Sequence, residues 1–184
     1  MLTRRYDDAF LLAHTLHRAQ QRKGSEIPYI AHLMSVSALV IENGGDEDQA
    51  IAGLLHDAAE DCGGAPTLAG IEQRFGAGVA AIVADCTDAW ETPKPAWRAR
   101  KEAYLSALPG KADRSLLVSL ADKVHNAESI LADHRAIGEA LWTRFTGGRE
   151  GTRWYYRALT DVFAKRLPGA LTERLARATT GFGG

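Results

Sequence analysis

The sequence predicts an all-α protein, because apolar residues recur at helical spacing through most of its 184 residues. Glycine and proline clusters divide this pattern into short segments, and no stretch has a convincing strand pattern. Neither internal repeats nor a low-complexity linker interrupts the chain. We therefore expect one compact domain over residues 1–184, long enough to bury a substantial core.

Three helices are expected in the first third of the chain. A first apolar stripe follows Thr3, a residue that can cap a helix. A second helix should follow Pro28 and stop at Asn43, where two glycines come next. Asp46 with Gln49 three residues later resembles a capping box, so a third helix should begin there.

The middle of the chain is expected to be more broken. Thr67 can cap a short helix that ends at Phe75, and residues 79–86 form another buried helical segment. Two prolines predict a loop over residues 90–96, followed by a basic helix to about Leu108.

The last third of the chain is expected to contain three further helices. A long, mostly apolar one starts at Ser115, an aromatic-rich one covers residues 154–163, and an amphipathic one follows Pro168. The glycine-rich residues 181–184 are expected to form a loose tail.

Composition narrows the possible partners. Lys and Arg total 22 against 23 Asp and Glu, so no overall field favours nucleic acid or an anionic membrane. No stretch resembles a signal peptide or a membrane span, so we expect a cytoplasmic protein. Cys62 and Cys86 are expected to stay reduced, and the sequence carries no signal for an oligomeric state.

Four ionisable side chains stand in and just after an apolar run of the third helix: His56, Asp57, Glu60 and Asp61. On one continuous helix, His56 and Glu60 would share a face, and Asp57 and Asp61 would share a neighbouring face. Because a buried charge is costly unless it is paired or bound to a metal, this pattern predicts a site.

Other helices can complete that site. His32, His56, Asp57 and Asp122 together supply two imidazoles and two carboxylates, which is a plausible metal set. Nitrogen and oxygen ligands without thiolate suit manganese, with iron, magnesium or zinc as competitors. Four protein ligands leave positions open on a six-coordinate ion, as a catalytic metal requires. A His-Asp pair alone is a weak motif, and the additional presence of His32 and Asp122 strengthens the prediction.

Three segments, residues 22–32, 54–61 and 120–126, resemble the hydrolase domain of the RelA/SpoT homologues, which belong to the HD-domain metal-dependent phosphohydrolases. The resemblance covers about residues 5–165. It implies a single HD-domain helical bundle. Because the chain ends soon afterwards, we expect no synthetase domain, as in the small alarmone hydrolases.

The resemblance also implies an activity, the removal of the 3′-pyrophosphate from guanosine tetraphosphate or pentaphosphate with one manganese ion. On this basis His32, His56, Asp57 and Asp122 are the expected metal ligands. Glu60 and Asp61 match the acidic pair that orients and deprotonates the attacking water. The expected substrate contacts are Arg22, Lys23, Tyr29, Asn126 and Tyr155.

Several alternatives stay open. The substrate could be another nucleotide, such as an adenine alarmone, NADPH or a deoxynucleotide, or the domain could bind alarmone without turnover. Glu128 departs from the family, which often has an arginine there, and a carboxylate facing the pocket would repel phosphate. His125 could orient Asp122 from behind, whereas the remaining histidines, among them His17, are expected to pack or face solvent. The basic residues in and after the proline loop, Lys94, Arg98, Arg100 and Lys101, are expected to form a solvated face.

Overall fold

The fold is all-α, as the sequence predicts. The computed structural model describes residues 1–90 and 93–183, and within them the only strand-like pairing is an isolated bridge between Gln21 and Pro28. The helices are α1 (Arg4–Leu16), α2 (Ile30–Glu42), α3 (Glu47–Leu55), α4 (Ala58–Asp61), α5 (Ala65–Phe75), α6 (Ala77–Cys86), α7 (Trp97–Ala107), α8 (Asp113–Ile137), α9 (Gly148–Arg166) and α10 (Ala170–Thr180), with short 3₁₀ helices η1 (Leu108–Gly110), η2 (Gly138–Arg144) and η3 (Gly181–Gly183).

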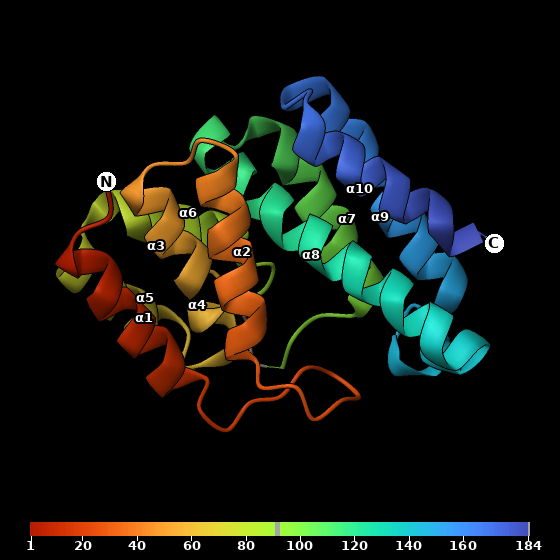
Figure 1. The fold of residues 1–184 in the computed structure, drawn as a ribbon, viewed down its shortest axis with the longest axis horizontal. Coiled ribbons are helices and arrows are strands. Elements are labelled where there is room, and N and C mark those ends of the chain that lie inside the picture. Colours follow the sequence, from red (N-terminus) through yellow and green to blue (C-terminus); the bar gives the residue numbers. More distant parts are fainter. Residues whose placement is uncertain (91–92, 184) are drawn as a thin grey trace.

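The long helix α8 joins the two ends of the molecule (Figure 1). On one side it packs against α2, α3 and α6, and on the other against α9, α10 and η2. Figure 1 shows α1 and α3 to α6 gathered at one end and α9 and α10 at the other. Residues of α8 therefore face both groups of helices.

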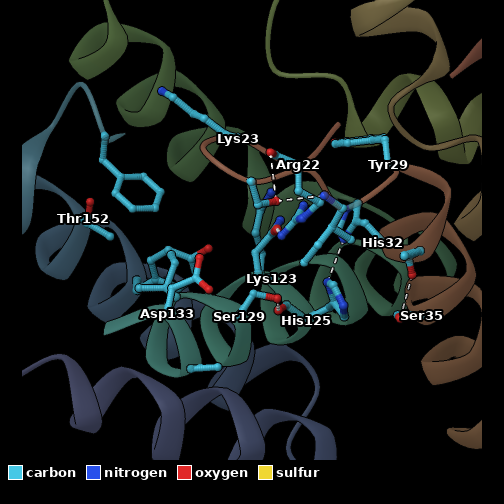
Figure 2. Close-up of a pocket in the computed structure, with 18 of the residues that line it drawn as sticks. Arg22, Lys23, Tyr29, His32, Ser35, Lys123, His125, Ser129, Asp133 and Thr152 are labelled. Carbon is cyan, nitrogen blue, oxygen red and sulfur yellow. Dashed lines mark hydrogen bonds between the residues drawn. The ribbon is translucent and has the colours of Figure 1, made fainter. Parts of the chain in front are cut away.

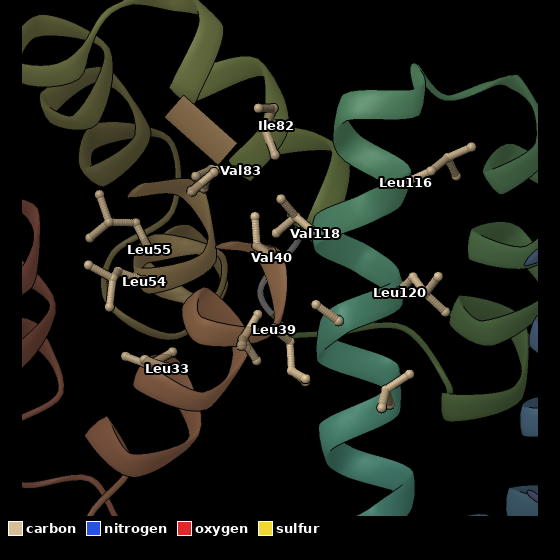
Figure 3. Packing of buried hydrophobic residues seen from close by; sticks show 14 of the residues in the cluster. Leu33, Leu39, Val40, Leu54, Leu55, Ile82, Val83, Leu116, Val118 and Leu120 are labelled. Atoms are coloured by element: carbon tan, nitrogen blue, oxygen red, sulfur yellow. The ribbon is translucent and has the colours of Figure 1, made fainter. Parts of the chain in front are cut away.

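Apolar side chains fill the space between α2, α3, α6 and α8, and the cluster continues on the opposite side of α8, where Leu116 and Leu120 point (Figure 3). Those labelled in Figure 3 are Leu33, Leu39, Val40, Leu54, Leu55, Ile82, Val83, Leu116, Val118 and Leu120, and all are buried. Each fully buried side chain of this size contributes about 1.5–3 kcal/mol to folding. This core fixes the three helices that carry the histidine and aspartate side chains of the candidate site.

The local signals in the first third of the chain are confirmed. The Thr3 side chain accepts a hydrogen bond from the amide of Arg5. Asp46 and Gln49 form a reciprocal capping box at the start of α3, with both bonds 3.0 Å long. The second helix ends at Glu42, and Gly44, two residues later, takes a positive φ of 83°.

Two helix boundaries differ from expectation. Thr67 does not cap α5, which begins two residues earlier, because Gly64 makes the turn with a positive φ of 67°. The Thr67 hydroxyl instead donates to the carbonyl oxygen of Cys62 at 2.7 Å. The helix expected from Ser115 begins at Asp113 and continues to Ile137.

The expected proline loop and the expected loose tail compare differently with the structure. Residues 91–92 of the expected proline loop lie outside the described residues, and its remaining residues up to Ala96 are not helical. The expectation of a loose tail is wrong for residues 181–182, because Phe182 is fully buried, with its ring against Trp142 and Tyr156. Gly184 lies outside the described residues.

The segment from residue 17 to residue 29, between α1 and α2, folds back on itself beneath the helices (Figure 1). The amide of Tyr29 donates to the carbonyl oxygen of Gln20 at 2.9 Å, and the amide of Arg22 donates to that of Ile27 at 2.8 Å. We call residues 17–29 the strap. Among the described helices, none is long and apolar enough to cross a bilayer.

Candidate metal centre and substrate pocket

The candidate site begins at a break between α3 and α4. The expectation of one continuous helix is wrong, since α3 ends at Leu55 and α4 begins at Ala58. The His56 side chain donates from Nδ1 to the carbonyl oxygen of Gly53 at 2.9 Å. In a continuing helix that oxygen would accept the amide of Asp57, so the imidazole competes with the helical bond.

Two histidines and two aspartates meet beside this break. The Nε2 atom of His56 lies 3.1 Å from Oδ2 of Asp57 and 3.7 Å from Oδ1 of Asp122. The Nε2 atom of His32 lies 3.3 Å from Oδ1 of Asp122 and 3.7 Å from Oδ2 of Asp57. The candidate ligand atoms of His32, His56 and Asp57 all lie within 4.8 Å of one another. The structure thus brings together the four side chains expected to bind metal.

The donor set fits a divalent cation. The Nε2 atoms of His32 and His56 are buried and make no hydrogen bond within the described part of the chain. The bond from Nδ1 of His56 to Gly53 leaves the Nε2 lone pair free to ligate. Burial alone would lower the pKa of His56, but the Asp57 and Asp122 carboxylates outweigh it and raise that pKa well above its usual value. The cluster therefore favours positive charge at the point where these atoms meet.

A second set of contacts orients these four residues. Nδ1 of His32 lies 2.8 Å from Nδ1 of His125. His125 was expected to orient Asp122, but its ring contacts His32 instead. Burial, then the charges of His32 and Arg22, lowers the pKa of His125 to about 4, so its ring is neutral. When Nε2 of His32 ligates, Nδ1 of His32 carries the proton and Nδ1 of His125 accepts its hydrogen bond. Asp122 accepts from Lys123 at 2.6 Å.

Tyr29 contributes to this set as well. Its hydroxyl donates to Oδ2 of Asp57 at 2.6 Å, so it touches a candidate metal ligand in addition to lining the pocket where substrate is expected.

A pocket of about 550 Å³ opens beside the cluster (Figure 2). Its walls come from the strap and from α2, α7, α8 and α9, and the charged and aromatic residues that line it include Arg22, Lys23, Tyr29, His32, Lys101, Lys123, His125, Asn126, Asp133, Tyr155 and Tyr156. Four of these are lysine or arginine, against a single carboxylate. The pocket is therefore large enough for a nucleotide and favours an anionic one.

Arg22 and Asn126 connect this pocket to the cluster. The Arg22 guanidinium donates to Oδ1 of Asn126 at 2.8 Å, and the Asn126 amide donates to Oδ1 of Asp122 at 2.5 Å. Lys23 forms no ion pair with any described residue, and Figure 2 shows it labelled at the pocket wall. All three expected substrate contacts in this group line the pocket.

Tyr155 also lines the pocket, although its side chain is only 5% exposed. Its hydroxyl has no hydrogen-bond partner among the described residues, and the Lys101 ammonium lies 5.0 Å from its ring centroid. Burial raises the pKa of Tyr155 well above its usual value, so the hydroxyl keeps its proton and can donate.

Glu60 and Asp61 lie outside that pocket. They line a second hollow of about 490 Å³ with Trp90 and Lys94. Glu60 accepts from the Lys94 ammonium at 2.7 Å and from the amide of Asp88 at 3.2 Å. Burial, then the charge of Asp88, raises the pKa of Glu60, and Lys94 opposes this rise.

Asp61 has a further partner. Its Oδ2 accepts from the side-chain amide of Gln20 in the strap at 2.9 Å. Its Oδ1 lies 3.8 Å from the Lys94 ammonium, so Lys94 is close to both carboxylates and closer to Glu60.

Sequence reasoning missed Lys123 and misread Lys94. Lys123 is a buried cation next to Asp122, and the signal for it was a lysine inside the apolar run of α8. Lys94 was expected on a solvated face, whereas it pairs with Glu60. Its position in a proline loop gave no periodicity from which to predict that contact.

Comparison with known proteins gives consistent relatives. The HD-domain family matches residues 9–152. A human protein named guanosine-3′,5′-bis(diphosphate) 3′-pyrophosphohydrolase MESH1 is 33% identical over 162 residues, which cover 82% of this chain and 88% of the relative. A Synechocystis protein named as a probable enzyme of the same activity is 34% identical over 125 residues, but that match covers 66% of this chain and only 16% of the relative.

The solved structures agree on the fold. One described as a metazoan ortholog of SpoT that hydrolyses ppGpp has a TM-score of 0.81 at 24% identity, covering 98% of this chain and 96% of that one, and this likeness shows the fold alone. A Listeria monocytogenes protein has a TM-score of 0.71 at 26% identity, covering 81% of this chain and 96% of that one.

Proposed function

This chain belongs to the HD-domain family, in the group of the MESH1 pyrophosphohydrolases, and from that premise we propose that it hydrolyses guanosine tetraphosphate or pentaphosphate. The products are GDP or GTP and pyrophosphate. The observation that carries the proposal is the cluster of His32, His56, Asp57 and Asp122 beside a nucleotide-sized pocket lined with cations.

An HD domain implies a divalent metal, and the two imidazoles and two carboxylates fit one. We propose manganese, since mixed nitrogen and oxygen ligands without thiolate suit it. When bound, the ion would acidify a water molecule and polarise the phosphoryl oxygens. Because the proposed substrate is a soluble nucleotide, the cytoplasm is the proposed site of action.

The chain's own residues divide the remaining work. Arg22 and Lys23 would bind phosphate groups, since a guanidinium can form a paired hydrogen bond and an ammonium supplies a point charge. Asn126 would keep Asp122 and Arg22 in register through the two bonds of its amide.

Glu60 and Asp61 would handle the water. Glu60 is the proposed proton acceptor, because burial raises its pKa toward neutral pH. Asp61 would orient the water through its carboxylate. Tyr155, with a buried hydroxyl that lacks a partner among the described residues, would donate to the nucleotide.

The proposal is tested by assaying a nucleotide panel with the chelated protein and again after adding manganese. Pyrophosphate release from guanosine tetraphosphate should require the metal, and His56→Ala should abolish it. Glu60→Gln should lower kcat by about 100-fold or more, because general-base catalysis commonly contributes that much. Two exposed positions supply matched controls, His14→Ala on α1 and Glu72→Gln on α5, and both should keep wild-type activity.

Other outcomes would contradict the proposal. Release of orthophosphate from a 2′ or 5′ position, or turnover only of an adenine alarmone, NADPH or a deoxynucleotide, would assign the site to a different nucleotide. Tight binding of guanosine tetraphosphate without turnover by the manganese-loaded protein would make the domain an alarmone sensor.

A further inference from the structure

His17 is a buried histidine with no place in the machinery described so far. It stands at the carboxyl end of α1, is 2% exposed, and was expected to be a packing or surface residue. Its ring stacks on that of Tyr29, with centroids 5.3 Å apart and an interplanar angle of 26°. Its Nδ1 atom lies 2.6 Å from the side-chain oxygen of Gln20. Both of these neighbours contact acidic residues of the proposed site.

The contact through Gln20 leads to Asp61. Since a carboxylate only accepts hydrogen bonds, the Gln20 amide nitrogen must face Asp61, at 2.9 Å. The Gln20 carbonyl then faces His17, whose Nδ1 must carry the proton. Sγ of Cys62 lies beside the His17 ring, 3.7 Å from Nδ1 and 3.8 Å from Nε2. The hydrogen bonds thus run in one direction, from the buried imidazole to the carboxylate.

The contact through Tyr29 leads to Asp57. The Tyr29 ring is held against His17, and its hydroxyl donates to Asp57 at 2.6 Å. The main chain supports the arrangement, because the Tyr29 amide donates to the Gln20 carbonyl oxygen at 2.9 Å. One imidazole at the base of the strap therefore contacts both neighbours, and each holds a different aspartate.

We propose that His17 and Gln20 are positioning residues that fix Asp61 toward the water, and that His17 also supports Asp57 through Tyr29. This inference rests on the proposed function of the same site. The Asp61 side chain is 29% exposed and sits at the end of a four-residue helix, where it would otherwise sample several rotamers.

The two partners of Asp61 lie at different distances. The Lys94 ammonium is 3.8 Å from Oδ1 of Asp61 but 2.7 Å from Glu60, so it pairs mainly with Glu60. The Gln20 amide, at 2.9 Å, is the one hydrogen-bond donor to the Asp61 side chain among the described residues. A neutral amide can orient the carboxylate without cancelling its charge.

Two conservative variants isolate the Gln20 arm. Gln20→Leu removes both of its hydrogen bonds at similar volume, and His17→Phe keeps the stack on Tyr29 but loses the bond to Gln20. Each should lower kcat by about 10–100-fold, the usual loss when a residue behind an active group is removed, with KM and manganese affinity unchanged. The double variant should lose no more than either single one, because both break the same chain of bonds. Gln21→Leu, the same change at the exposed neighbour, should match wild type.

The Tyr29 arm has a separate readout. Tyr29→Phe keeps the stack on His17 but loses the bond to Asp57, so manganese affinity measured by calorimetry should fall by about 10-fold. His17→Ala removes both supports and should lower kcat and manganese affinity together. Thermal melting identifies any variant whose loss reflects unfolding, and the Phe and Leu variants keep the volume of the buried site.

Failure of this inference is distinguishable from failure of the proposed function. Unchanged kcat in both Gln20→Leu and His17→Phe, with an active wild type, would overturn the role of the Gln20 arm. If the wild type turned over no nucleotide, the proposed function would fail. Crystal structures would still test whether Gln20 and His17 position the Asp61 side chain. The Asp61 side chain should then keep one rotamer in wild type and leave it in Gln20→Leu, and the same rotamer in both would reject the inference.

Discussion

Glu128 lies two residues beyond Asn126 on α8, yet its carboxylate turns toward α10. Both oxygens accept from the Arg174 guanidinium, at 3.0 and 2.9 Å, and Glu128 does not line the pocket. The departure of this chain from the family at residue 128 therefore does not bring a negative charge to the substrate. It is compensated by an arginine on a neighbouring helix.

Glu128→Arg should leave the KM for guanosine tetraphosphate unchanged and lower the melting temperature. The variant would set two guanidinium groups against each other at a half-exposed position, with a cost on the order of 1 kcal/mol. Adding Arg174→Glu should restore stability by reversing the pair. A lower KM in the single variant would show that residue 128 faces the pocket after all.

The residues of the site differ in how far the sequence could predict them. His56 and Asp57 could be predicted because an imidazole and a carboxylate in an apolar run need a reason to be buried. The role of His17 could not, because its contacts with Gln20 and Tyr29 depend on how the strap folds back, and no periodicity sets the path of a loop. Lys123 shows the same limit, since a lysine becomes a buried ion only once α8 has packed.

At the scale of elements, the crossing of α2 and α3 carries the geometry of the metal ligands. Gly53 lies at a close contact between the two helices, since a Cβ there would meet Cα of Ser37 at 2.9 Å. The carbonyl oxygen of the same glycine holds Nδ1 of His56. The spacing of α2 and α3 and the orientation of one ligand thus depend on a single residue.

Gly53→Ala should therefore destabilise the protein by about 1–3 kcal/mol, because the extra methyl group forces the two backbones apart. It should also weaken manganese binding, since His32 and His56 lie on the two helices that separate. Gly70→Ala on α5 is the matched control: a Cβ there meets nothing within 4 Å, and removal of a helical glycine should leave stability equal or higher. Equal melting temperatures for the two variants would contradict the close packing.

Element boundaries were predictable where the signal is local. Thr3 and Asp46 each bond to an amide two or three residues away, so the sequence alone contains both partners. The break after Leu55 was not predictable, because alanine and leucine surround it and the cause is a histidine side chain competing for a helical carbonyl. Thr67 is the converse, a residue with capping chemistry that bonds to Cys62 instead.

At the scale of the whole molecule, the core and the candidate metal site make separate contributions. The apolar cluster runs through nearly all the helices, so we expect the chain to fold without a cation. The four candidate ligands nevertheless place two carboxylates close together. A bound divalent ion would relieve the repulsion between them. The metal should therefore add stability to a chain that is already folded.

Chelation should lower the melting temperature without loss of helical circular dichroism at room temperature. A metal present at 100 times its Kd adds about 2.7 kcal/mol. For a chain of this length each kcal/mol shifts the melting temperature by about 2–4 °C, so the expected change is roughly 5–10 °C. His56→Ala should melt at the same temperature with and without manganese. Cooperative loss of helix on chelation at 25 °C would show instead that the metal is needed for folding.

The ligands of the cluster come from three stretches of the chain, and the last of them, Asp122, lies on α8. While the protein is being synthesised, α2 and α3 can meet as soon as they emerge, but the fourth ligand is still untranslated. A nascent chain would hold the ion with an incomplete set of ligands and release it readily. Tight metal capture would then mark the moment at which α8 has docked, so the ion would report on completed assembly as well as serving the reaction.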